Sequence, residues 1–139
     1  MSEFTNLGVK AIRDGVSAGD FTAREVAEAF NAAVAEAAEL NAFIVTTPDH
    51  ALAAADKVDA DRAAGKPLGK MAGVPIGMKD LFATHGVQTT AASHILEGFK
   101  PEYESTVSQN LWDAGAGMLG KLNLDQFAMG SSNETSYFG

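Results

Sequence analysis

The chain has 139 residues, of which 46% are apolar and 20% charged, which suits one soluble globular domain of modest size. Acidic residues outnumber basic ones by 18 to 10, so a grip on nucleic acid through phosphate neutralisation is not expected. The chain contains no cysteine, signal sequence or apolar run of membrane-spanning length, which excludes disulfides and thiol catalysis and favours a cytoplasmic location.

The first 65 residues are expected to be mainly helical. A short helix is predicted over residues 5–14, with Gly15 as its stop signal. Thr22 and Glu25 have the spacing of a capping box, in which side chains and backbone N–H groups at a helix start satisfy one another. A second helix is therefore predicted from this point to about Asn41.

A strand and a third helix are predicted next. Residues 42–46 (AFIVT) form a β-branched and aromatic run that is typical of a strand. Thr47 and Pro48 match an N-cap followed by proline in the first helical turn, and Gly65 marks the end of that helix. The glycine-containing turn at residues 65–69 is short, which indicates a tight connection and not a linker between domains.

The texture changes after this turn, because glycine and proline interrupt the apolar runs. Residues 74–80 and 116–120 are predicted as buried strands. Between them, Ser105 or Thr106 can cap a helix that ends at Asp113, and residues 123–126 have the spacing of a further capping box. The alternation of helices and strands predicts an α/β fold.

A glycine-rich run at residues 115–121 (GAGMLGK) matches two phosphate-binding patterns by spacing alone. Both patterns need a strand before the glycines and a helix after them. Here the expected order is reversed, and Leu122 stands where one pattern requires Ser or Thr. We therefore predict that Lys121 does no nucleotide chemistry and that the glycines allow close packing.

Lys79 is the candidate catalytic residue. In a strand over residues 74–80, it shares one face with Pro75 and Gly77. A lysine in so apolar a strand is expected to be partly desolvated, which disfavours the charged form and lets a neutral amine act as a base. Gly77 is expected to leave space beside it. The alternative is a lysine at a strand end that reaches water and has no catalytic role.

A second candidate site lies at residues 130–132 (GSS), because a loop of small residues can present hydroxyl and N–H groups to an anion or oxyanion. Serines in such loops also form ordinary turns. His50, His85 and His94 have no ligand-like spacing, so neither a metal site nor a histidine-based triad is predicted. A serine nucleophile would need lysine as its base.

The sequence resembles the amidase signature family. The similarity begins at residues 73–80 (GVPIGMKD), continues through residues 86–90 and 93–97, and extends over residues 120–132 (GKLNLDQFAMGSS). The ending at residues 133–139 (NETSYFG) is most similar to the branch that serves tRNA-dependent amidotransferases. The resemblance implies a mixed central sheet covered by helices, preceded by a helical N-terminal region.

The resemblance also implies site residues. The family uses a serine nucleophile, a second serine with a cis peptide bond, and a lysine that serves as base and proton relay; Lys79 matches that lysine. Met129, Gly130 and Ser131 match a segment that lines the substrate pocket. Gln126 stands where relatives usually have Glu, and this exposed-looking change is expected to disturb little.

The glycine- and serine-rich stretch that carries both family serines does not occur in this sequence. We therefore expect residues 1–139 to be an incomplete N-terminal portion of a single amidase domain, with residues 1–65 mainly helical and residues 66–139 starting the α/β core. On this view the chain alone lacks a nucleophile and is inactive.

The function implied by the resemblance is that of a glutaminase subunit in a heterotrimeric ligase of protein biosynthesis. Such a subunit releases ammonia from glutamine, and partner subunits of the B and C type use ATP and Mg to amidate Glu-tRNA(Gln) or Asp-tRNA(Asn). No cofactor or metal is expected on this chain itself. Two alternatives stay open: a free-standing amidase of the family that acts on another small amide, and a non-enzymatic helical interaction module.

Overall fold

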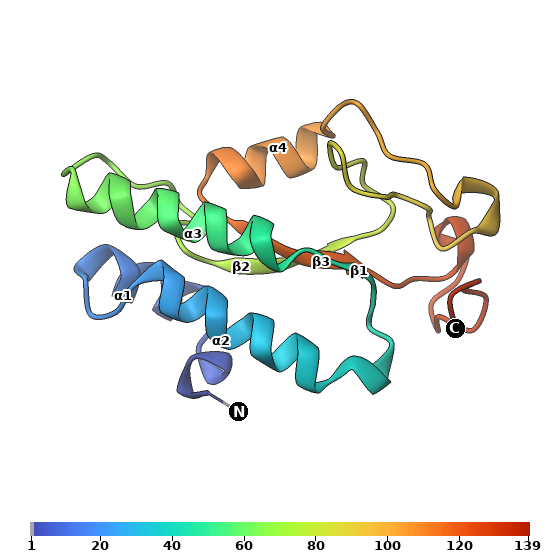
Figure 1. Ribbon diagram of the computed structural model, residues 1–139, viewed down its shortest axis with the longest axis horizontal. Coiled ribbons are helices and arrows are strands. Elements are labelled where there is room, and N and C mark those ends of the chain that lie inside the picture. The colour runs from blue at the N-terminus through green and yellow to red at the C-terminus, as the bar shows by residue number, and fades with distance from the viewer. Residues whose placement is uncertain (1) are drawn as a thin grey trace.

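A computed structural model describes residues 2–139 (Figure 1). The α-helices are α1 (Val9–Ala18), α2 (Ala23–Glu36), α3 (Pro48–Ala63) and α4 (Thr106–Asp113). The strands are β1 (Phe43–Thr46), β2 (Pro75–Lys79) and β3 (Gly117–Leu122). Short 3-10 helices lie at Glu3–Asn6, Ala38–Leu40, His94–Leu96 and Gln126–Ala128. The α/β fold class is confirmed, and none of the helices in residues 2–139 is long and apolar enough to cross a bilayer.

The strands form one mixed sheet with β3 in its centre. β1 pairs antiparallel with β3, and β2 pairs with β3 in parallel, with Lys79 opposite Leu122. Because β2 and β3 run in the same direction, their C-terminal ends lie at the same end of the sheet. The segments that follow these two strands therefore start side by side.

Helices α1, α2 and α3 share one hydrophobic core with the sheet. α2 packs against α3, and α3 lies against β3 (Figure 1). The buried apolar residues of this core come from all three helices, from the segment before β2 and from β3: Ile12, Val16, Ala23, Val26, Ala27, Ala51, Ala55, Val58, Ala72, Val74 and Leu119. The core therefore joins the helical first half of the chain to the strands of the second half.

The start of α2 is fixed both locally and by α3. The predicted capping box is confirmed: Thr22 Oγ1 accepts from the N–H of Glu25 at 3.1 Å, and Glu25 Oε2 accepts from the N–H of Thr22 at 2.8 Å. The Asp59 carboxylate of α3 accepts from the N–H groups of Ala23 and Arg24, each at 3.0 Å. A carboxylate at this position also suits the positive end of the helix dipole.

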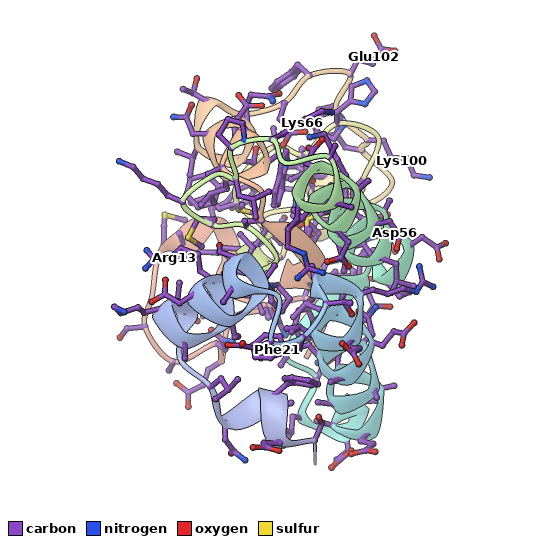
Figure 2. The ribbon with its side chains drawn as sticks, turned by 90° about the vertical axis from the view of Figure 1, so that its left-hand side faces the viewer. Arg13, Phe21, Asp56, Lys66, Lys100 and Glu102 are labelled. Carbon is purple, nitrogen blue, oxygen red and sulfur yellow. The ribbon has the colours of Figure 1, made fainter. Side chains whose placement is uncertain are left out.

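The first helix departs from its predicted bounds of residues 5–14. α1 begins after a 3-10 turn, continues past Gly15, and ends at Gly19, whose φ of 84° is left-handed. Gly15 is buried inside the helix, where an added Cβ would overlap the ring of Phe21. Figure 2 shows Phe21 between α1 and α2. Gly15 therefore serves packing, and the glycine four residues later ends the helix.

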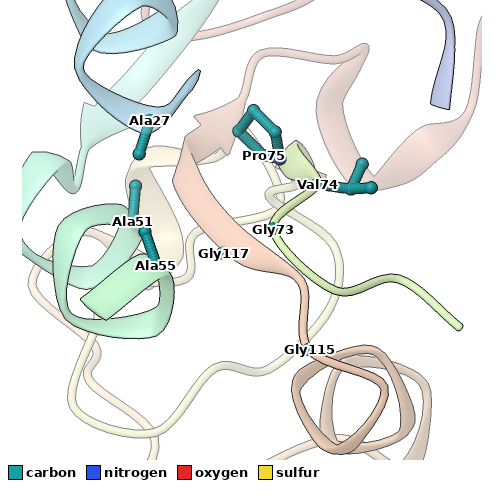
Figure 3. Close-up of a pocket in the computed structure, with 8 residues that line it drawn as sticks. All are labelled: Ala27, Ala51, Ala55, Gly73, Val74, Pro75, Gly115 and Gly117. Atoms are coloured by element: carbon teal, nitrogen blue, oxygen red, sulfur yellow. The ribbon is translucent and has the colours of Figure 1, made fainter. Parts of the chain in front are cut away.

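Small residues let the helices approach the sheet closely, as the sequence predicts for its glycines. Figure 3 shows Ala27 of α2, Ala51 of α3 and Gly117 of β3 around a cavity of about 10 Å³. That volume holds no more than about one water molecule. An added Cβ at Gly117 would lie 3.2 Å from the main chain of Ala51. A larger residue there would push α3 away from β3.

The remaining caps follow the predictions in part. Of the two predicted caps for α4, the structure selects Ser105, whose side chain accepts from the N–H of Ser108. α3 begins at Pro48 with Thr47 at the N-cap position as predicted, but Thr47 Oγ1 donates to the carbonyl of Met118 at 2.8 Å and makes no cap bond to the helix. The capping box expected at residues 123–126 is wrong, because only a 3-10 turn follows and the Asn123 side chain binds elsewhere.

Candidate active site

Lys79 is the last residue of β2, and its side chain is exposed. The main chain around it is held firmly: the carbonyl of Lys79 accepts from the N–H of Phe82, and the N–H of Asp80 donates to the carbonyl of Leu122, both at 3.0 Å. The prediction that the Lys79 side chain is partly desolvated is wrong for the part of the chain that the structure describes, because this side chain is exposed. β2 forms an edge of the described sheet, where a neighbouring strand covers one side only.

The space expected beside Gly77 is also absent. An added Cβ at Gly77 would lie 2.8 Å from Leu122 Cδ2, so the Leu122 side chain fills this position. The alternation predicted for the strand is confirmed for Val74, Met78 and Asp80, which are all buried, but Ile76 is only half-buried. The pairing with β3 shifts between Ile76 and Gly77, and this irregularity interrupts the alternation.

The second group of predicted site residues lies on an exposed segment after β3. Met129 is 78% exposed, and Ser131 is exposed as well. Gly130 backs onto the Asp125 carboxylate, where an added Cβ would lie 2.6 Å from Asp125 Cγ. Only a glycine lets the main chain pass this close.

Asp125 organises the loop that carries these residues. Its carboxylate is nearly buried and accepts from the N–H groups of Ser132 (2.8 Å), Asn133 (3.0 Å) and Thr135 (3.2 Å), and from the Thr135 hydroxyl (2.9 Å). These donors, with Asn133 the strongest, hold the pKa of Asp125 at about 2 although burial acts to raise it. The N–H group of Ser132 is thus already engaged, contrary to the expectation that the 130–132 loop offers it to an anion.

The structure connects the two predicted sites through the loop between β2 and α4. The N–H of Ala91 donates to the carbonyl of Asp80, and the carbonyl of Ala91 accepts from the N–H of Phe127, each at 2.9 Å. Ala91 therefore links Asp80, the neighbour of Lys79, to the segment that begins at Phe127 and leads to Met129. Figure 1 shows this loop beside the C-terminal segment at one end of the sheet.

Two buried alanines of this junction have an unusual main-chain conformation, and Phe127 (φ 54°) shares it. Ala91 and Ala92 both have left-handed φ angles, of 50° and 55°, which are costly for residues with a side chain. Both are buried, and the carbonyl of Ala92 accepts from the N–H of Tyr137. Gln126 is half-buried and donates to the Ser93 hydroxyl at 2.7 Å, so the expectation that it is exposed is wrong.

Lys121 is a buried charged residue that the sequence reasoning missed. Its side chain is fully inaccessible, and its ammonium donates to the carbonyl of Phe82 (2.9 Å), Thr84 Oγ1 (3.0 Å) and Thr89 Oγ1 (2.7 Å). Asp80 Oδ1 lies 3.2 Å from the same nitrogen. Burial lowers the pKa of Lys121, and the Asp80 carboxylate opposes that lowering.

The geometry around the glycine-rich run matches the order predicted for it. α4 precedes the run, and β3 (Gly117–Leu122) contains Gly117, Gly120 and Lys121, so no helix starts directly after the glycines to hold a phosphate. The three N–H donors of Lys121 are occupied inside the protein. Within residues 2–139, no cluster of three or more His, Cys, Asp or Glu side chains could hold a metal ion.

The sequence of residues 25–139 matches the family model described as Amidase. The chain belongs to the amidase family. This confirms the family resemblance found at residues 73–80 and 120–132, and the match includes Lys79 and the segment from Met129 to Ser131.

Curated relatives give a closer description of this amidase-family chain. It is 82% identical to the A-type subunit of the glutamyl-tRNA(Gln) amidotransferase of Novosphingobium aromaticivorans, and 77% identical to its namesake in Sphingopyxis alaskensis. Each match includes 100% of this chain and 28% of the relative. The chain thus spans little more than a quarter of the length of these relatives.

Solved structures of the family share the fold. One chain of a vestigial protein complex, described as revealing the evolutionary origins of an s-triazine catabolic enzyme, is 36% identical with a TM-score of 0.91, over 96% of this chain and 30% of that one. The native peptide amidase of Stenotrophomonas maltophilia is 29% identical with a TM-score of 0.82, over 90% of this chain and 26% of that one. The mixed sheet and its helices are therefore an amidase-family arrangement.

Proposed function

We propose that this chain is part of a glutaminase subunit in a tRNA-dependent amidotransferase, and that it belongs to a single, longer amidase domain. The observation that carries the proposal is the 82% identity, along the whole chain, to a protein named as the A-type subunit of a glutamyl-tRNA(Gln) amidotransferase. At this level of identity we expect the role of the relative to be retained.

In the proposed reaction Lys79 is the base. Its neutral amine takes the proton of a serine hydroxyl, and the serine oxygen attacks the side-chain amide carbon of glutamine. The amide nitrogen then receives this proton through the same relay, the C–N bond breaks, and ammonia leaves. Water then hydrolyses the acyl-enzyme. The serines and the groups that desolvate Lys79 would come from the longer subunit. The exposed position of Lys79 at the end of β2 leaves its amine accessible to them.

We further propose that Met129, Gly130 and Ser131 line the glutamine pocket. Support comes from the topology, since this segment follows β3 at the end of the sheet where β2 ends in Lys79. Partner subunits of the B and C type would take the ammonia and use ATP and Mg²⁺ to amidate misacylated tRNA in the cytoplasm. This chain itself would bind neither ATP nor Mg²⁺.

The first test replaces Lys79 in the full-length subunit, assembled with its partners. We expect Lys79→Ala to lower ammonia release from glutamine at least about a hundredfold, because the base that also relays the proton is lost. Lys79→Arg should fail as well, since a guanidinium cannot give up its proton. Lys10→Ala removes an exposed lysine of α1 and serves as the matched control. Near-normal ammonia release by folded Lys79→Ala would refute the assignment.

A free-standing amidase for another amide is the second candidate, favoured by the likeness to the peptide amidase. The same preparation distinguishes the two, because a glutaminase subunit should release ammonia from glutamine much faster than from peptide amides. The non-enzymatic helical module is disfavoured by the mixed sheet in the core and by the family match.

A further inference from the structure

An ion pair without access to solvent lies directly behind the proposed base. The side chains of Asp80 and Lys121 are both 0% exposed, with Asp80 Oδ1 3.2 Å from Lys121 Nζ. The ammonium also holds the 82–89 loop, through the carbonyl of Phe82 and the hydroxyls of Thr84 and Thr89. None of these contacts is used in the proposed chemistry.

Asp80 is the residue next to Lys79. Its polar atoms all make hydrogen bonds except Oδ1, which faces the Lys121 ammonium as an ion-pair contact only. Its carboxylate Oδ2 accepts from the N–H and the hydroxyl of Thr90. Its N–H donates to the carbonyl of Leu122 in β3, and its carbonyl accepts from the N–H of Ala91. Three segments that are distant in sequence therefore meet at this one residue.

The same contacts reach the proposed pocket wall. Asp80 and Thr90 fix the turn in which Ala91 and Ala92 have left-handed φ angles, and the carbonyls of these two alanines bind the N–H groups of Phe127 and Tyr137. The segment between those two N–H groups contains Met129, Gly130 and Ser131. A shift at the ion pair would move the pocket wall relative to Lys79.

We propose that Asp80 and Lys121 are positioning residues, whose ion pair sets the place of Lys79 relative to the Met129–Ser131 segment. A buried ion pair is often no more stabilising than apolar residues of the same volume, so stability alone does not account for it. A positioning role accounts for the pair, because a misplacement of catalytic groups by about 1 Å can lower the rate about a hundredfold. The inference rests on the proposed function, in which Lys79 is the base.

The test separates positioning from stability. In the assembled full-length subunit, Asp80→Asn combined with Lys121→Met removes both charges, keeps an oxygen that accepts from Thr90, and leaves no charge unpaired. At a temperature where near-UV circular dichroism shows wild type and double variant folded, we expect kcat for glutamine hydrolysis to fall at least about tenfold, with KM within about threefold. A merely structural pair would leave kcat of the folded variant unchanged.

If the double variant does not fold, two single variants with smaller changes test the positioning role instead. Thr90→Val removes a hydroxyl that donates to Asp80 and accepts from the N–H of Ala92, and so loosens the Asp80 end of the ion pair and the turn beside it. Thr47→Val removes a hydroxyl that donates to Met118 in β3, away from the site. We expect Thr90→Val to lower kcat at least about threefold and Thr47→Val to leave it unchanged.

The outcomes also distinguish this inference from the proposed function. Wild-type kcat in Thr90→Val or in the folded double variant, together with inactive Lys79→Ala, would overturn the positioning role alone. A wild-type subunit that releases no ammonia from glutamine, or an active Lys79→Ala, would overturn the proposed function and the inference with it.

Discussion

At the scale of single residues, the Asp125 carboxylate controls the conformation of the proposed pocket wall. It accepts hydrogen bonds from three N–H groups and one hydroxyl of residues 132–135, and it leaves no room for a side chain at position 130. These bonds stabilise the charged form, and this explains a folded-state pKa of about 2. The loop is therefore expected to depend on pH through this one group.

We expect the protection that Asp125 gives to residues 132–135 to be lost in acid. The folded-state pKa of about 2 lies below the unfolded value of about 3.9, so the stabilisation is nearly complete above about pH 5 and is lost as the pH falls through about 2. Hydrogen–deuterium exchange of the full-length subunit measures it. Wild type should protect these amides better than Asp125→Ala at pH 7, and the difference should shrink steadily as the pH is lowered from about 4 to about 2. A difference as large near pH 2 as at pH 7 would contradict the prediction.

At the scale of secondary-structure elements, Gly120 controls how closely β1 approaches β3. An added Cβ at this position would overlap the carbonyl oxygen of Val45 and would lie 3.0 Å from Thr46 Cα. We expect Gly120→Ala to destabilise the full-length subunit by about 1–3 kcal/mol, the usual cost of overpacking, as measured by urea unfolding. Gly8→Ser is the control: nothing lies within 4 Å of a Cβ there and serine suits the N-cap position of α1, so the change should stay within about 0.5 kcal/mol.

Elements with local signals can be predicted from the sequence, and pairings between distant residues cannot. The capping box of Thr22 and Glu25 needs only three residues of spacing, and its predicted place is correct. Gly15 has the local pattern of a stop signal, but its neighbour Phe21 makes it a packing residue.

The site shows the same division. Lys79 can be singled out from its apolar strand, but its exposure depends on β2 lying at an edge of the sheet, which only the pairing with β3 decides. Lys121 belongs, in the sequence, to a false phosphate motif. Its burial against Asp80 follows from the parallel register of β2 and β3, which no local pattern reveals. The one sequence signal for the burial of Lys121 is its place in the largely apolar run of residues 117–122 (GMLGKL).

At the scale of the whole molecule, we expect residues 1–139 alone to be catalytically inactive and prone to associate. Within the described sheet β1 and β2 each have one unpaired edge, and apolar side chains such as Leu40, Ile95 and Met129 are more than two-thirds exposed. Ammonia release from glutamine should be undetectable, and light scattering should detect species larger than the monomer. Measurable turnover, or a monomer that unfolds in one cooperative step at roughly 5–15 kcal/mol, would contradict the respective half of this expectation.

The central place of β3 has a consequence for biosynthesis. Ribosomes make β1 first, β2 second and β3 last, although β3 is the only partner of each in the described sheet. While residues 117–122 are still in the exit tunnel, β1 and β2 have nothing to pair with, whereas α2 and α3 can already dock on one another. Pairing between distant segments is also slow, since loop closure costs entropy before any contact forms. A nascent chain that ends before β3 is therefore expected to expose two unpaired strands to chaperones and proteases, while α2 and α3 can already pack on one another.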